Sequence, residues 1–128
     1  MLAGVCVGTN DLDAASSFYD AVLATIGMER RMQNEHETGY GPPEGSASFW
    51  VLTPYDQAPA TFGNGTQVMF AAQSVKHVQQ FHACAMSLGG QDEGAPGLRN
   101  YAPGYYGAYC RDLDGNKLHV FYIQAETD

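Results

Sequence analysis

Positive charge is scarce in this sequence. The 128 residues include 6 Lys and Arg against 14 Asp and Glu, which gives a formal net charge of −8 at pH 7. The basic residues form no cluster, so the composition argues against nucleic acid and anionic membrane surfaces as partners. The same charge leaves cationic small molecules open as ligands.

Paired cysteines and long apolar runs are also missing. Cys6, Cys84 and Cys110 are odd in number, lack Cys-x-x-Cys spacing and lie in apolar segments, which predicts reduced, buried thiols. No apolar run approaches the ~18 residues of a membrane-spanning helix, and no basic segment precedes Leu2. We therefore expect a soluble, cytoplasmic protein with no membrane partner.

Common catalytic motifs are absent too. The sequence has no serine–histidine–aspartate order, nucleophile elbow, phosphate loop or His-Glu-x-x-His motif. Asp112, Asp114 and Asn116 resemble the start of a calcium loop, but no glutamate stands where it would close that loop. We interpret 112–116 as a structural turn.

The residues that are present are typical of one folded, strand-rich domain. Hydrophobic residues make up 45% and charged residues 16%, with 15 glycines and 8 tyrosines. A chain of this length has room for one core. Predicted strands cover 3–8, 28–33, 48–53, 66–72, 105–110 and 117–123. Predicted helices follow caps at 9–11 and 74 and end near 27 and 88. We expect a polar segment at 34–39, a turn at 40–45 and a loop at 94–104.

The sequence repeats its pattern after 63 residues. Five pairs of positions share a role in strand, cap, helix or stop: Val5 and Val68, Asp11 and Ser74, Leu12 and Val75, Phe18 and Phe81, Gly27 and Gly90. The repeat predicts an α+β fold with two tandem βαβββ modules, in a curved mixed sheet around a cleft. Within a single domain 1–128, module one covers about 1–56, the linker about 57–65 and module two about 66–125.

A hairpin near the C-terminus carries the most informative histidine. Strand-like segments flank 112–116, whose acidic and glycine residues suit a tight reversal. In the second arm, His119 alternates with apolar residues and shares a face with Phe121. Any chemistry in this protein is expected to face His119.

The sequence contains the motifs Asn10-Asp11-Leu12, Gly39-Tyr40-Gly41, Phe49-Trp50, Gly63-x-Gly65-Thr66, Gly97-Leu98-Arg99, and above all Arg111-Asp112-x-Asp114-Gly115-Asn116. Together these motifs resemble the vicinal oxygen chelate superfamily, which includes glyoxalase I, extradiol dioxygenases, fosfomycin-inactivating thiol transferases and bleomycin-resistance proteins. The resemblance covers nearly the whole chain. It implies the glyoxalase/bleomycin resistance fold and a homodimer.

The resemblance also implies positions for metal ligands on the first and last strands of each module. These positions fall on Gly4, Gln67, near Val51 and on His119. Glycine and valine side chains cannot bind a cation, so only His119 and Gln67 are candidates for a divalent metal. Zinc and iron sites usually take three protein ligands, so no cofactor is assigned with certainty.

Further candidates for ligand contact come from aromatic and loop residues. Tyr40, Trp50, Tyr105 and Phe121 would line the cleft where their strands expose alternate side chains. Arg99 is read either as a clamp for an anionic ligand or as an ion-pair partner of nearby acids.

The sequence predicts a glyoxalase/bleomycin-resistance-like protein that binds a small molecule in its cleft and lacks the full metal site of the family. One alternative is a metal-dependent lyase, like lactoylglutathione lyase, or a dioxygenase that uses His119 and Gln67. Another is a resistance protein that sequesters a cationic drug, in keeping with the net charge of −8.

Overall fold

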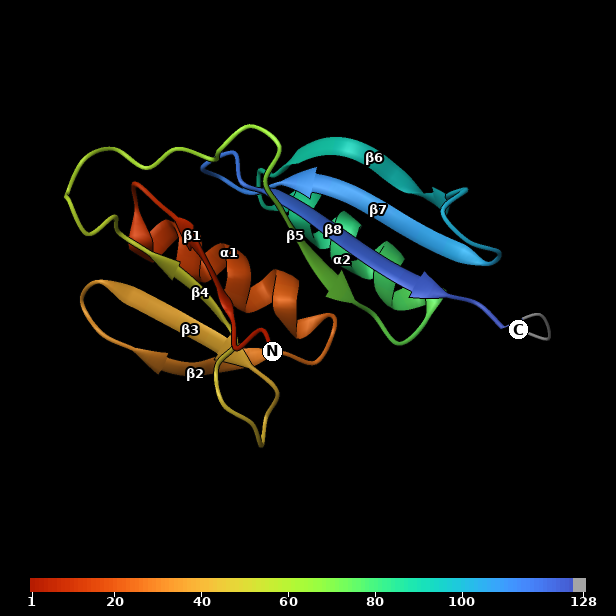
Figure 1. The fold of residues 1–128 in the computed structure, drawn as a ribbon, viewed down its shortest axis with the longest axis horizontal. Helices are drawn as coiled ribbons and strands as arrows, with labels where there is room; N and C mark the ends of the chain where they lie inside the picture. The colour runs from red at the N-terminus through yellow and green to blue at the C-terminus, as the bar shows by residue number, and fades with distance from the viewer. Residues whose placement is uncertain (126–128) are drawn as a thin grey trace.

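The structure, a computed structural model that describes residues 1–125, consists of two successive βαβββ modules (Figure 1). Module one contains β1 (Val5–Gly8), α1 (Leu12–Ala24), β2 (Glu29–Gln33), β3 (Glu37–Gly41) and β4 (Phe49–Leu52). Module two contains β5 (Gln67–Ala71), α2 (Val75–Ser87), β6 (Gln91–Leu98), β7 (Tyr105–Arg111) and β8 (Lys117–Ile123). A long loop joins β4 to β5.

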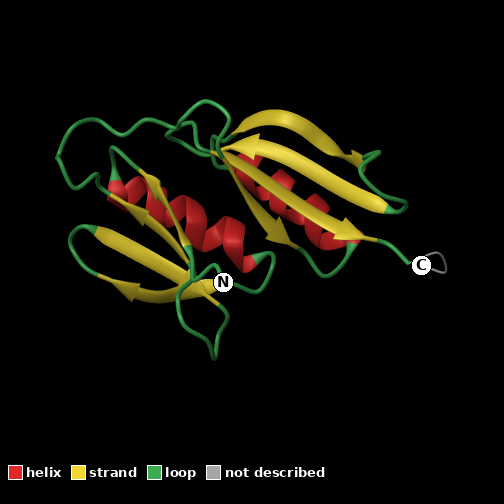
Figure 2. Cartoon of the chain, in the orientation of Figure 1, coloured by secondary structure: helices red, strands yellow, loops and turns green. Residues whose placement is uncertain are grey.

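Each module forms its own four-stranded mixed sheet (Figure 2). The strand orders are β1-β4-β3-β2 and β5-β8-β7-β6, with a parallel pair at β1 and β4 and again at β5 and β8. The predicted α+β fold of two βαβββ modules is confirmed. The predicted single curved sheet is divided in two, and a groove of about 470 Å³ lies between β1 and β5.

The two helices begin where the sequence predicted. Asp11 caps α1 by accepting a hydrogen bond from the backbone N–H of Ala14, and Ser74 caps α2 by accepting one from His77. Each helix has 13 residues, and the bounds of α2 follow those of α1 by 63 positions, as the repeat requires. No helix in the described part of the chain is long and apolar enough to cross a membrane.

The core lies between each helix and one face of its own sheet, and continues across the contact between α1 and α2. Contacts between aromatic rings continue this core from module one to module two. The ring of Phe49 lies 4.9 Å from that of Tyr19 and 5.3 Å from that of Phe70, and Phe70 lies 5.7 Å from Phe81. The opposite face of each sheet, turned away from the helices, is called its open face below.

The predictions of a turn at 40–45 and a loop at 94–104 were wrong in part. Gly94 to Leu98 belong to strand β6, and Tyr40 and Gly41 belong to β3. The register of β6 against β7 shifts on either side of Gly94, so β6 is an irregular edge strand. Bulged edge strands tolerate the glycine and proline that made this stretch look like a loop.

The prediction of buried thiols holds for one cysteine of three. Cys110 is buried, but Cys84 is half-buried and Cys6 is exposed. Cys6 alternates with core residues Val5 and Val7, so its side chain lies on the open face of module one.

The turn between β7 and β8 ties module two to module one. Buried Asp112 accepts a hydrogen bond of 2.5 Å from the hydroxyl of Tyr19 on α1. Asn116 donates to the backbone carbonyl of Gly8 at 2.9 Å and to Asp112 at 2.9 Å. The structural role predicted for this turn is therefore supported by its bonds to both modules.

Candidate functional site

The candidate site is the open face of module two. Strand β8 turns Leu118 and Val120 into the core beneath α2, so Lys117, His119 and Phe121 lie on the opposite face. On β7, the same alternation places Tyr105 beside them. Histidine, aromatic and cationic side chains therefore meet on one surface.

His119 is the most enclosed polar group of this face. Its side chain is buried, and Nε2 shares a hydrogen bond of 3.2 Å with the hydroxyl of Tyr105. Its ring stacks on Tyr109 with centroids 4.2 Å apart. The other ring nitrogen, Nδ1, is buried without a hydrogen-bond partner. A buried polar atom of this kind costs roughly 1–3 kcal/mol when it stays unpaired.

The electrostatic surroundings keep His119 neutral. Burial lowers the pKa of its imidazole from 6.5, and the nearby charges of Arg99 and Lys117 lower this pKa further. A neutral imidazole has one donor and one acceptor nitrogen. At neutral pH, His119 can therefore accept a hydrogen bond or a proton.

Tyrosine hydroxyls surround this histidine. The hydroxyls of Tyr101 and Tyr109 share a hydrogen bond of 2.6 Å. Burial, with the hydrogen bond to Tyr101, raises the pKa of Tyr109 to about 12. Burial also raises the pKa of Tyr105. The phenols of Tyr105 and Tyr109 therefore keep their protons at neutral pH.

Two cations flank the same aromatic group. The guanidinium carbon of Arg99 lies 5.6 Å from the ring centroid of Tyr109, and Nζ of Lys117 lies 5.3 Å from it. Both distances are within the range of cation–π attraction. The face thus combines flat rings with local positive charge.

Four of the predicted ligand-contact residues come together on this face: Tyr105, Arg99, His119 and Phe121. Arg99 bonds to backbone carbonyls, and the acids proposed as its ion-pair partners bind His82 and Arg111 instead. Sequence reasoning missed the roles of Tyr101, Tyr109 and Lys117. Strand alternation could have identified two of them, because Tyr109 stands four residues after Tyr105 and Lys117 stands two residues before His119.

In module one, the counterpart of His119 is Trp50. Met69 pairs with His119 just as Cys6 pairs with Trp50, and Cys6 stands 63 residues before Met69. The predicted position near Val51 was therefore one residue too late, since Val51 lies in the core. A Cβ added at Gly4 would come within 2.4 Å of the Trp50 ring. The indole thus occupies the space of a side chain at the first inherited position.

The prediction that Tyr40 lines a cleft was wrong. Tyr40 is fully buried, and its hydroxyl donates to the backbone carbonyl of Ser16 and to Asp20, both on α1. Its neighbour Gly39 occupies the open face instead, where the Trp50 ring lies over it. The alternation of β3 therefore places Tyr40 under the helix.

The residues present do not fit the three-ligand metal site of the superfamily. Gln67 pairs with Lys117 in register, two positions away from the pair of Met69 and His119. A lysine next to the amide opposes a cation, and residues 1–125 contain no group of three His, Cys, Asp or Glu that could hold a metal ion. The inherited positions thus supply two side-chain donors at most.

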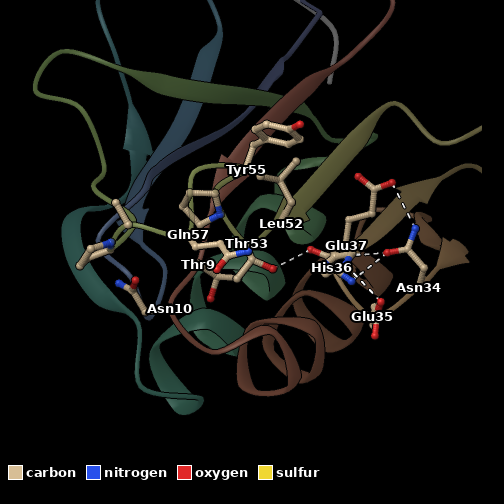
Figure 3. A pocket seen from close by; sticks show the side chains of 13 residues that line it. Thr9, Asn10, Asn34, Glu35, His36, Glu37, Leu52, Thr53, Tyr55 and Gln57 are labelled. Atoms are coloured by element: carbon tan, nitrogen blue, oxygen red, sulfur yellow. Dashed lines mark hydrogen bonds and ion pairs between the residues drawn. The ribbon is translucent and has the colours of Figure 1, made fainter.

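The larger cavity of the protein lies elsewhere, at one end of the module-one sheet (Figure 3). It measures about 890 Å³ and lies between the β2–β3 turn and the loop after β4. Glu35, His36 and Glu37 line one side, and Gln57 lies across from them. No Lys or Arg lines it. Volume alone favours this cavity, whereas the unpaired buried nitrogen favours the His119 face, which we regard as the better candidate.

The low pKa of His119 predicts a pH-dependent stability. Because the folded-state pKa lies below 6.5, the unfolded chain binds a proton first, and the free energy of unfolding should fall as pH decreases from 6.5 through the folded-state pKa. Replacing His119 by phenylalanine should flatten this decrease. Urea unfolding of both proteins at neutral and mildly acidic pH measures it. His36→Phe, at an exposed histidine, is the control, and an unchanged slope in His119→Phe would contradict the prediction.

Solved structures share this fold. A glyoxalase/bleomycin resistance protein/dioxygenase family enzyme from Burkholderia phytofirmans matches with a TM-score of 0.74 at 20% identity, covering 96% of this chain and 98% of that one. A lactoylglutathione lyase from Agrobacterium tumefaciens matches with a TM-score of 0.67 at 20% identity, covering 95% and 92%. The fold is that of the vicinal oxygen chelate superfamily.

A more similar structure identifies the family. A glyoxalase/bleomycin resistance protein from Albidiferax ferrireducens is 40% identical, with a TM-score of 0.84, over 94% of this chain and 96% of that one. The chain belongs to the glyoxalase/bleomycin resistance protein family. No sequence model of a protein family and no curated protein matches the chain.

Proposed function

We propose that this protein binds a flat small molecule on the open face of module two, without a resident metal held by its own side chains. The observation that carries the proposal is the buried Nδ1 of His119, which lacks a partner within a cluster of aromatic rings. A ligand that donates a hydrogen bond to Nδ1 would remove the penalty of leaving it unpaired.

Access to Nδ1 requires a movement of the rings around it. Tyr101 is the least packed of them, since 63% of its surface is exposed. Its ring lies 5.0 Å from that of Tyr105 and 6.4 Å from that of His119. Side chains at exposed positions change rotamer within nanoseconds, so a ligand can displace Tyr101 without changing the sheet.

Chemical-shift mapping with indole, a flat neutral probe whose N–H can donate to Nδ1 of His119, tests this proposal. We expect the largest shifts at His119, Tyr105 and Tyr109. Tyr109→Ala should weaken binding by roughly 3- to 10-fold, because an aromatic stacking pair contributes about 0.5–1.5 kcal/mol beyond its area. Tyr55→Ala, at a fully exposed tyrosine that lines the other cavity, is the matched control. Shifts confined to the surroundings of Tyr55 would contradict the proposal.

A metal-dependent lyase or dioxygenase would need donors beyond His119 and Gln67. Such donors would have to come from the substrate or from a second chain, since zinc and iron sites usually take three protein ligands. Metal analysis of the purified protein distinguishes the two proposals. Stoichiometric zinc, nickel, manganese or iron that is lost in His119→Ala would favour the metal enzyme and contradict a metal-free site.

A second candidate function, sequestration of a cationic drug, is favoured by the cavity of about 890 Å³. Its lining includes the carboxylates of Glu35 and Glu37 and no basic residue, in a chain of net charge −8. Cations gather in acidic clefts. Bleomycin is a suitable cationic probe.

Thermal unfolding in the presence of bleomycin tests sequestration. Binding to the folded state should raise the melting temperature with increasing drug concentration. The rise should shrink when Glu35 and Glu37 are both replaced by glutamine and persist in Glu44→Gln, which removes an exposed carboxylate outside the cavity. An unchanged melting temperature at high drug concentration would contradict this function.

The homodimer and the cytoplasmic location remain predictions from the sequence. We propose the dimer because closed twofold pairing is the commonest assembly of soluble proteins and would enclose an open sheet face. Sedimentation equilibrium over a range of protein concentrations measures the assembly. A monomer at all concentrations would contradict it.

A further inference from the structure

We infer that the ligand of this face is an aromatic anion that also carries a hydrogen-bond donor, such as a hydroxyl-bearing aromatic carboxylate, whose charge is held by Arg99 and Lys117. The inference rests on the proposed function, because it names the ligand class of the same face. It requires positive charge that the protein itself leaves uncompensated, in a chain whose net charge is −8.

Arg99 and Lys117 have no acidic partner. Three other arginines are neutralised by ion pairs: Arg30 with Asp20, Arg31 with Glu29, and Arg111 with Glu93. Within residues 1–125, none of the ion pairs includes Arg99 or Lys117, although acids outnumber bases by 14 to 6 in the whole sequence. The two cations on the candidate face are therefore free to pair with a ligand.

The backbone of β6 gives Arg99 a defined place. A Cβ added at Gly94 would lie 3.3 Å from one guanidinium nitrogen of Arg99, and a Cβ added at Gly97 would lie 3.2 Å from another. Because both residues are glycines, the guanidinium can occupy this space. It donates to the backbone carbonyl of Ala95 at 2.6 Å and weakly to that of Leu98 at 3.3 Å. These partners are uncharged, so they orient the guanidinium without cancelling its charge.

Lys117 brings the second charge, with Nζ 5.3 Å from the ring centroid of Tyr109. It stands two residues before His119 on β8 and shares its face, while Arg99 extends over β6. Both charges contribute to the lowered pKa of His119, which shows that they act on the same region. Two like charges near one ring repel each other, and a bound anion would relieve that repulsion.

The aromatic part of the ligand is inferred from the ring pairs on the same face. Tyr105 stacks on Phe121 with centroids 5.1 Å apart and an interplanar angle of 10°. Tyr109 stacks on His119 with an angle of 25°. A flat ring can lie against such pairs, and a planar carboxylate matches the fork of a guanidinium. The hydroxyls of Tyr101 and Tyr109 share one hydrogen bond, which leaves one hydroxyl hydrogen of the pair as a neutral donor for the anion.

Three probes of nearly equal shape test the inference: the 4-hydroxy derivatives of benzoate, benzamide and benzamidine, which share a phenol that can donate to Nδ1 of His119. They are negative, neutral and positive at neutral pH. Titrations followed by chemical shifts should show hydroxybenzoate binding roughly 10-fold tighter than hydroxybenzamide, since a charge-assisted bond adds about 1.5 kcal/mol over a neutral one. Hydroxybenzamidine should bind weakest, and added salt should weaken hydroxybenzoate alone.

Variants then assign the charge preference to the two cations. Arg99→Gln and Lys117→Gln should each remove much of the preference for hydroxybenzoate, and the double variant should bind hydroxybenzoate and hydroxybenzamide equally. Lys76→Gln is the control, because Lys76 is an exposed lysine on α2. Each single variant tests the inference independently if the other fails to fold.

The outcomes separate this inference from the proposed function. If hydroxybenzoate and hydroxybenzamide bind this face equally in the unmodified protein, the anion inference is overturned and the proposed function stands. If neither shifts the signals of His119 and Tyr109 at millimolar concentrations, both are overturned. Tightest binding by hydroxybenzamidine would overturn the inference and favour the cationic ligand.

Discussion

Replacing Phe49 by alanine is expected to lower the free energy of unfolding by about 4 kcal/mol, because truncating a buried phenylalanine removes its apolar contacts and leaves a cavity. Phe49 is almost fully buried. Its ring touches that of Tyr19 in module one and that of Phe70 in module two, so its loss weakens the core on both sides of the module boundary. Urea unfolding followed by circular dichroism measures the change.

Phe62→Ala is the matched control, because the same atoms are removed from a ring that is 45% exposed. Its expected loss is about 1 kcal/mol or less, and includes its contact with the guanidinium of Arg111. If the two modules were independent units joined only by the linker, Phe49→Ala would unfold module one and leave module two intact. A single cooperative transition at lower denaturant concentration supports one shared core.

Local sequence signals predicted most of the fold because they report short-range physics. Asp11 and Ser74 predicted the starts of both helices, since a capping side chain acts within its own turn. Strand β6 was missed because its place is determined by pairing with β7, and a strand with bulges shows no regular alternation. The division into two sheets depends on how the modules pack, which no local pattern reports.

The candidate site was only partly predictable. His119, Tyr105 and Phe121 follow from strand alternation once the hairpin is recognised. The side chain of Arg99 lies over β6, in room left by the glycine at 94. Because this strand was predicted to be a loop, the residues that Arg99 contacts could not be derived from the sequence. Tyr40 failed for a simpler reason: no strand was predicted over Glu37–Gly41, so there was no basis for assigning its faces.

The charge around His119 differs in sign from the net charge of the chain. The value of −8 suggested a cationic ligand, and the cavity near His36 keeps that acidic character. The face around His119 carries two unpaired cations instead. Because screening limits the reach of surface charges to about 8 Å at physiological salt, each site responds to its own residues more than to the sum over the chain.

Replacing Asp112 by alanine is expected to destabilise the protein by about 3 kcal/mol, because breaking a buried network of charged hydrogen bonds leaves its donors unpaired. The carboxylate of Asp112 accepts from the hydroxyl of Tyr19, the backbone N–H of Asp114, and both the backbone N–H and the side-chain amide of Asn116. Tyr19 is fully buried, so its hydroxyl would find no water to replace Asp112. Urea unfolding measures the loss.

The loss of stability in Asp112→Ala should also depend on pH in a defined direction. Burial raises the pKa of the Asp112 carboxyl above 3.8, so the folded state holds the proton more tightly than the unfolded chain. The stability that this proton contributes is present below pH 3.8 and is lost as pH rises through the folded-state pKa. The difference in unfolding free energy between the unmodified protein and Asp112→Ala should therefore shrink across that window.

Tyr19→Phe, which keeps the ring and removes one donor, should lose only about 1 kcal/mol. Glu44→Ala, at an exposed carboxylate, should lose almost nothing. If Asp112→Ala proved no more harmful than Glu44→Ala, the turn between β7 and β8 would not hold the two modules together.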